Sequence, residues 1–184
     1  MYRLKRFLPR NILRLLYNSL ILPHLQYCIM IWGYKSSRVA KLQKNAVRTL
    51  CNSKYNAHTE PLLKNMNLLK VSDIFKTRII RFYYKHVNGT LPRYIENSFP
   101  RNSENHHYLT LRNREIQLNQ YNTTHGGNTL RYFLPSIISN LPPCIIDKIE
   151  THSYDGFSRY VNKFIISSYS SVCEIENCYI CENT

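Results

Sequence analysis

The stretch SDIFKTRIIRFYYKHVNG, residues 72–89, predicts one well-bounded helix. Ser72 is the expected N-cap of a helix over residues 73–87, and Asn88-Gly89 supplies a left-handed stop after it. At helical spacing one broad face is apolar and consists of Phe75, Ile79, Phe82, Tyr83 and His86. The narrow remaining face carries three cations within about 60° of one another, namely Arg78, Arg81 and Lys85.

Residues 36–51 predict a second helix with the same two-sided character. Ser36 is its expected N-cap, and the apolar face is formed by Val39, Leu42, Ala46 and Leu50. The nearly opposite face carries cations, which are Arg38, Lys41, Lys44 and Arg48. The sequence therefore predicts two helices that each present a basic stripe.

A long helix is expected before this pair, over residues 10–31. Pro9 suits the start of such a helix, since the first helical turn loses nothing when an N–H is missing. Pro23 predicts a bend or break within it. Gly33 is expected to end it.

The rest of the chain has shorter and weaker patterns. A short helix is expected after Thr59, and a second one is expected to end at Asn97. The weaker segments are an extended connector at 68–71, short strands at 108–112 and 116–120, and a strand or helix at 130–138. A last helix is expected from near residue 153 or 155 to about residue 169.

These elements predict a mainly α protein: a small helical bundle, then an α+β or irregular segment, then a C-terminal helix. The expected divisions are a basic helical domain over 1–98, a loop-rich segment with short strands over 99–150, a C-terminal helix over 151–172, and a cysteine-containing tail over 173–184. At 43% hydrophobic and 12% aromatic residues, the 184-residue chain is too apolar for a disordered tail.

Charge is distributed very unevenly along the chain. The formal net charge is +14, but residues 1–95 hold 18 Lys and Arg against two acids, Glu60 and Asp73, and are +16. Residues 96–184 hold seven cations against nine acids and are −2. A basic half without carboxylates repels itself unless it meets a polyanion. The expected partner is therefore the backbone of RNA or DNA, with an anionic membrane surface as the less favoured alternative.

A membrane-spanning reading arises because residues 15–34 contain no charged side chain. Polar groups interrupt this stretch, however, and they include Asn18, Ser19, Pro23, His24 and Gln26. No cleavage site with small residues follows it, which disfavours a secretory signal. The expected location is intracellular, in the cytoplasm, the nucleus or both, without membrane attachment.

Signs of catalysis and metal binding are few. No phosphate-binding glycine loop or nucleophile motif occurs, and the three aspartates are far apart in sequence, so no catalytic residue is assigned. Asp73 and Asp155 fit the first turns of helices. Cys173, Cys178 and Cys181 have a spacing that partly suits zinc, but a fourth ligand is lacking at a standard distance, so no metal site is assigned.

Seven short segments, taken in order, resemble the region after the palm in reverse transcriptases of jockey-like non-LTR retrotransposons. They are LYNSLILPHLQYCIMIWG (16–33), LQKNAVR (42–48), HTEPL (58–62), LLKVSDI (68–74), YKHVNGTLP (84–92), TLRN (110–113) and PSIISNLP (135–142). Each piece is short, but together they extend over nearly the whole chain.

The resemblance implies the thumb and C-terminal region of an RNA-directed DNA polymerase. The family's catalytic paired-aspartate strand lies upstream of this region and has no counterpart here, so the segment is not expected to be catalytic alone. No cofactor is expected in it, and Mg²⁺ would belong to the missing palm. Residues 1–98 would then be thumb-like, with the palm as a possible protein partner.

Three hypotheses follow from the sequence. In the first, the segment binds nucleic acid and holds primer and template, with contacts from the two basic stripes. In the second, it is a decayed element fragment without activity, in which residues 15–34 are left exposed because their partner surface is absent. In the third, it is a membrane-associated helical protein.

Overall fold

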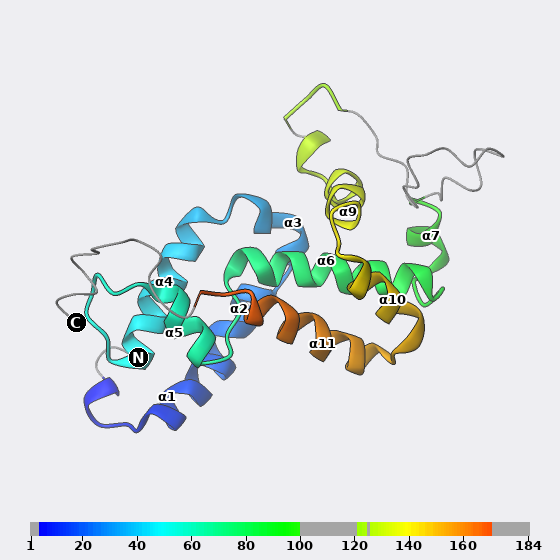
Figure 1. The fold of residues 1–184 in the computed structure, drawn as a ribbon. Coiled ribbons are helices and arrows are strands. Elements are labelled where there is room, and N and C mark those ends of the chain that lie inside the picture. Colours follow the sequence, from blue (N-terminus) through cyan, green and yellow to red (C-terminus); the bar gives the residue numbers. More distant parts are fainter. Residues whose placement is uncertain (1–3, 100–120, 125, 171–184) are drawn as a thin grey trace. The chain divides into compact units, whose positions relative to one another are not determined.

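The computed structural model describes residues 4–99, 121–124 and 126–170, and within these ranges the chain is helical and contains no strand (Figure 1). The predicted mainly α class is confirmed. Two compact units are formed, one from residues 1–75 with 162–184 and the other from residues 76–161. The expected strands at 108–112 and 116–120 and the tail at 173–184 lie outside the described residues.

The first unit begins with η1 (Leu4–Arg6), followed by one helical rod built of α1 (Arg10–Leu16), the π-helical turn η2 (Tyr17–Ile21) and α2 (Leu22–Gln26). Pro23 has no N–H to donate and its ring would clash with the carbonyl four residues earlier. The π-helical turn before Pro23 leaves room for the proline ring, since the Leu22 N–H bonds to Tyr17 O, five residues back, and not to the carbonyl four residues back.

The expected helix over 10–31 is interrupted at a different place than Pro23. Tyr27 is extended (ψ 122°) and Cys28 is left-handed (φ 47°), so the rod ends at Gln26. A separate short helix, α3 (Ile29–Trp32), and a 3-10 turn, η3 (Gly33–Lys35), follow. The predicted position of the break was wrong, because the chain changes direction at Tyr27 and the left-handed Cys28 and not at Pro23.

Gly33 does not end a helix through a left-handed conformation, since its φ is −64°. Its role is close packing: a Cβ built on Gly33 would lie 2.7 Å from Phe75 Cδ2 and 2.8 Å from Ile29 Cγ1. Both distances are shorter than atoms in contact can tolerate, so the absence of a side chain lets η3 approach Phe75, which belongs to helix α6 (Val71–Val87).

Replacing Gly33 with alanine is therefore expected to lower the free energy of unfolding by about 1–3 kcal/mol, through overpacking against the Phe75 ring. Urea unfolding followed by circular dichroism measures the change. Gly127→Ala is the matched control, because a Cβ at Gly127 would meet nothing within 4 Å. Equal stability of the two variants would contradict the packing role of Gly33.

The helix expected over 36–51 is present as α4 (Ser37–Cys51), with Ser36 at the N-cap position but without a side-chain capping bond. Its buried residues are Gln43, Val47 and Leu50. Leu42, expected on the apolar face, is instead 67% exposed. The buried face is rotated toward Gln43 because α4 contacts α1 and α5 (Thr59–Asn65) along that side.

Helix α6 (Val71–Val87) begins earlier than expected, so Ser72 lies in its first turn and is not its N-cap. The Val71 N–H is one of the donors that a helix start leaves unsatisfied, and it bonds to Oε1 of Gln43 at 2.9 Å. The cap thus comes from a side chain on α4, distant in sequence. The predicted end is confirmed, since Gly89 has φ 61° and Thr90 N–H bonds to Lys85 O at 2.9 Å.

Residues 162–170 complete the first unit through one buried side chain, Tyr169. Its hydroxyl donates to Asp73 Oδ2 at 2.6 Å and accepts from the Lys70 N–H at 3.0 Å. Lys64 Nζ donates to the Tyr169 carbonyl at 2.6 Å. Three contacts thus fix the end of the described chain to the segment around the start of α6.

The second unit contains residues 76–87 of α6 together with α7 (Arg93–Glu96), η4 (Gly126–Asn128), α9 (Leu130–Ile138), α10 (Pro143–Thr151) and residues 154–161 of α11 (Tyr154–Ser167). The short helix before Asn97 and the last helix are confirmed. Residues 130–138 are helical, and α10 was not expected, because Pro143 opens a helix at its first position instead of breaking the chain.

An aromatic cluster holds the core of the second unit. Tyr84 stacks on Phe157 with ring centroids 4.8 Å apart, and its hydroxyl donates to the His152 carbonyl at 2.6 Å. Phe82 meets Phe99 edge to face at 5.5 Å. Of the apolar face expected on α6, Phe82 takes part in this packing, and the other four side chains are buried.

Candidate nucleic-acid interface

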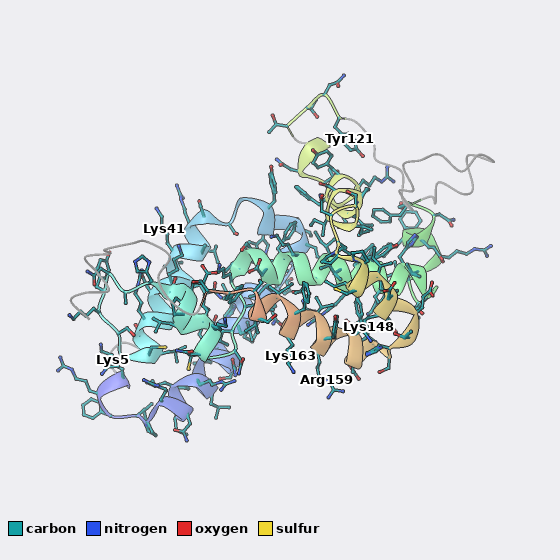
Figure 2. All side chains as sticks on the ribbon, in the orientation of Figure 1. Lys5, Lys41, Tyr121, Lys148, Arg159 and Lys163 are labelled. Carbon is teal, nitrogen blue, oxygen red and sulfur yellow. The ribbon has the colours of Figure 1, made fainter. Side chains whose placement is uncertain are left out.

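Helix α4 presents three exposed cations, Arg38, Lys41 and Lys44. Lys41 extends outward from the helix in Figure 2. The three are spaced three residues apart, which gives a rise of about 4.5 Å between neighbours along the helix. Gln43, Val47 and Leu50 face the core, whereas all three cations are exposed. The structure therefore keeps this part of the expected stripe on one accessible face.

Arg48, the fourth cation of the expected stripe, is half-buried and has two hydrogen bonds. Its Nε donates to the Ala57 carbonyl at 2.8 Å, and its Nη1 donates to Asn45 Oδ1 at 3.2 Å. The geometry of the guanidinium is set by the loop after α4. Arg48 is therefore a brace for that loop as well as a source of positive potential.

Both acids of residues 4–75 have their hydrogen-bond or ion-pair partners outside α4, although Glu60 is close enough to Lys44 for their charges to interact. Glu60 pairs with Lys70 Nζ at 2.8 Å, and Asp73 is buried and accepts the Tyr169 hydroxyl. The pKa of Glu60 lies below its ordinary value, first because Lys70 hydrogen-bonds the carboxylate, with a smaller contribution from the charge of Lys44. No carboxylate belongs to α4 itself, so its cationic face has no negative charge from its own helix.

The second expected stripe, on α6, belongs to the second unit and is less exposed. Arg78 and Arg81 are half-buried, and Lys85 is exposed with its Nζ 5.0 Å from the centre of the Tyr154 ring. The pKa of Arg81 is lowered, first because burial disfavours its charge and then because Arg78 adds like charge nearby. Of the two stripes, the one on α4 is the more accessible to a large anion.

The sequence offers Trp32, Tyr83 and Tyr84 as aromatic residues that could stack on bases, although aromatic residues at such helical spacings are more often part of a core. Tyr83 and Tyr84 are buried, and the half-buried Trp32 donates its Nε1–H to the Tyr27 carbonyl at 2.7 Å. Exposed tyrosines of the first unit lie elsewhere, and they are Tyr27, Tyr34 and Tyr55.

The sequence reasoning passed over these exposed tyrosines, although Tyr55 carried a usable signal. It lies in the polar segment Asn52–Asn56 between two helices, where an apolar side chain has no core to enter. Tyr55 is accordingly 85% exposed.

Among the residues that the structure describes, no three His, Cys, Asp or Glu side chains gather closely enough to hold a metal ion. The cysteines at 173, 178 and 181 lie outside those residues. In the same part of the chain, none of the helices combines the length and the apolar character needed to cross a bilayer. Comparison of the chain with protein-family models, with curated proteins and with solved structures finds no match.

Proposed function

We propose that the chain binds the phosphate backbone of RNA or DNA through Arg38, Lys41 and Lys44 of α4. The observation that carries the proposal is the exposure of these three cations on one face of a helix that has no carboxylate. Lys and Arg bind phosphates largely by displacing condensed counterions, which requires accessible positive charge and little base-specific geometry. Binding is therefore expected to depend on salt and to show little sequence preference.

The burial of the other face of α4 favours nucleic acid over a lipid surface. An interfacial helix inserts its apolar face among the acyl chains. In α4 that face, with Val47 and Leu50, is already packed inside the protein. The cationic face carries one exposed leucine, Leu42, which is too little apolar surface for insertion of the helix.

The role proposed for this binding comes from the resemblance noted in the sequence. The chain would act as the thumb-like and C-terminal part of a non-LTR retrotransposon reverse transcriptase, holding primer and template while the palm performs catalysis. Exposed apolar side chains before α4 support a protein partner as well: Leu15, Leu20 and Ile31 are each more than half exposed. The palm is the partner that the resemblance implies.

The expected result for Arg38→Ala/Lys41→Ala/Lys44→Ala is a loss of affinity for a fluorescent 20-nucleotide DNA or RNA and a weaker dependence on salt. Each phosphate contact contributes a slope of about −0.7 to −0.9 in log K against log salt, so removing three contacts is expected to reduce the slope by about 2 to 3. Fluorescence anisotropy between about 50 and 200 mM salt measures both quantities.

The matched control is Arg131→Ala/Arg159→Ala/Lys163→Ala, which removes the same net charge from exposed positions outside α4. It is expected to leave the slope nearly unchanged. If both triple variants lost affinity equally, the α4 face would have no special role. If the unmodified protein bound with no salt dependence, the backbone proposal itself would be wrong.

The alternative that the chain is a decayed fragment makes a different prediction, because residues 15–34 would then lack their partner surface. It predicts broad, noncooperative thermal unfolding and binding of hydrophobic dyes by the isolated chain. A single cooperative transition in calorimetry, with no dye binding below it, would count against this alternative.

A further inference from the structure

Tyr55 lies at the tip of a tight turn that follows α4. The turn spans Lys54 to Ala57 and is closed by a hydrogen bond from Ala57 N–H to Lys54 O at 3.1 Å. Tyr55 and Asn56 are its two central residues, and the Tyr55 side chain is 85% exposed. A large aromatic ring is thus held away from the core by the backbone of the turn.

The turn is tied to the cationic helix by Arg48. Ser53 N–H bonds to the Arg48 carbonyl at 3.0 Å, and the Arg48 side chain donates its Nε–H to the Ala57 carbonyl at 2.8 Å. One residue of α4 therefore fixes the loop at both ends of the segment that contains Tyr55. The position of the ring is consequently set relative to the end of α4, although Tyr55 itself lies in a loop.

Helix α4 and the turn after it supply the two components of a surface for single strands. Such surfaces combine cations that follow the backbone with aromatic rings on which bases stack. Here Arg38, Lys41 and Lys44 supply the cations, and the braced Tyr55 supplies a ring at the end of the same helix. In a duplex each base face is covered by its neighbour, so a protruding ring finds a stacking partner only where a base is unpaired.

We propose that α4 and the turn after it bind single-stranded nucleic acid, with one unpaired base stacked on Tyr55. The inference rests on the proposed function, because the α4 cations provide the attraction that brings the strand to the ring. It adds the substrate class, a single strand or an unpaired end, and it assigns Tyr55 as a contact residue and Arg48 as the positioning residue that orients it.

The test compares three labelled probes of equal length: oligothymidylate, an abasic oligomer with the same phosphates but no bases, and a DNA duplex. For Tyr55→Ala we expect a loss of affinity for oligothymidylate of about 5- to 150-fold, the range found for one stacked base. Affinity for the abasic oligomer and for the duplex is expected to stay unchanged. Tyr55→Phe retains the ring and is expected to bind as the unmodified protein does.

Tyr94→Ala is the matched control, since Tyr94 is 87% exposed but belongs to α7 in the second unit. It is expected to change none of the three affinities. Because Tyr55 and Tyr94 contribute almost nothing to the core, both alanine variants are expected to fold, and circular dichroism checks this.

Arg48→Lys separates positioning from charge. Lysine keeps the positive charge but lacks the guanidinium Nε–H that reaches Ala57, so the turn loses its brace. We expect reduced affinity for oligothymidylate, unchanged affinity for the abasic oligomer, and the same salt slope as in the unmodified protein. A merely electrostatic role for Arg48 would leave all three probes unaffected.

Two outcomes would overturn the stacking proposal while leaving backbone binding intact: an unaltered affinity of Tyr55→Ala for oligothymidylate, or an equal loss for the abasic oligomer. Failure of the unmodified protein to bind any probe would refute the proposed function instead. Vesicles of phosphatidylserine and phosphatidylcholine test the other anionic surface. Vesicle binding that depends on Tyr55, with oligothymidylate unaffected, would overturn both assignments in favour of a membrane.

Discussion

Replacing Gln43 with alanine is expected to lower the free energy of unfolding by about 3–5 kcal/mol, which is at the upper end for a single substitution. The Gln43 side chain is 3% exposed and has three hydrogen-bond partners in the core of the first unit. Its Nε2 donates to Tyr17 Oη at 3.1 Å and to the Leu69 carbonyl at 2.8 Å. Its Oε1 accepts the Val71 N–H.

The size of the effect follows from what the alanine variant leaves behind. Three polar groups lose their partner at once. Those on Tyr17 and Val71 are buried and the Leu69 carbonyl is half-buried, and each unsatisfied buried group costs about 1–3 kcal/mol before any rearrangement. They belong to three different parts of the first unit, so no single movement satisfies all of them. Gln43→Glu keeps the shape but loses both donated bonds, and we expect it to be destabilised as well.

Urea unfolding measured by circular dichroism tests this expectation, with Lys41→Ala as the control on the exposed face of α4. Lys41→Ala is expected to change the free energy of unfolding by less than about 0.5 kcal/mol. A loss of under about 1 kcal/mol for Gln43→Ala would show that the three bonds do not act together. The two variants also separate the roles of α4, since one alters stability and the other nucleic-acid affinity.

The second large effect is expected at Tyr169. Tyr169→Ala removes a buried ring, for which we expect a loss of about 3–5 kcal/mol. Tyr169→Phe removes only the hydroxyl that joins Asp73 Oδ2 and the Lys70 N–H, for which about 1–3 kcal/mol is expected. The difference between the two variants measures the packing of the ring on its own. Equal losses would mean that the hydroxyl carries the whole effect.

The hydroxyl of Tyr169 also predicts a dependence of stability on pH. Burial raises the pKa of Tyr169 far above its ordinary value, and the hydrogen bond to Asp73 raises it further. Because the pKa is raised in the folded state, the protonated Tyr169 hydroxyl contributes fully to the free energy of unfolding below about pH 10, which is the pKa of an unfolded tyrosine. This contribution is lost as the pH rises above that value. The slope for one such group is at most about 1.4 kcal/mol per pH unit.

Urea midpoints measured at several pH values from about 8 to 11 test this dependence. Tyr169→Phe is expected to have a shallower alkaline slope than the unmodified protein. Some slope is expected to remain, since burial also raises the pKa of Tyr17, although its hydrogen bond from Gln43 opposes that shift. An identical slope in both proteins would contradict the assignment to Tyr169.

Helical periodicity predicted α4, α6 and α11, because each has a face that must be buried. The short helices α5 and α7 were expected from signals at their ends, and α7 has no buried residue. It placed Arg38, Lys41 and Lys44 together, and the structure has them exposed on one face. Leu42 was assigned to the wrong face, since hydrophobicity alone does not show that a glutamine one position along occupies the core.

The interactions over long sequence distances were beyond prediction from local patterns. The cap of α6 comes from Gln43, and the fixing of residues 162–170 depends on Asp73. The hydrogen bond from Arg48 to the Ala57 carbonyl joins a helix to a loop. It can be predicted only when the conformation of that loop is known. A period of 3.6 residues describes one helix at a time, so it contains no information on which side chains of different helices meet.

The sequence by itself determined that this protein is mainly helical and that its first half is strongly basic, because both properties depend on residue types and spacing along the chain. Only the tertiary structure decided which cations remain accessible, that Gln43 belongs to the core, and that Tyr55 is exposed on a braced turn. The physical reason is burial: whether a polar or aromatic side chain meets solvent or protein depends on the packing of elements distant in sequence.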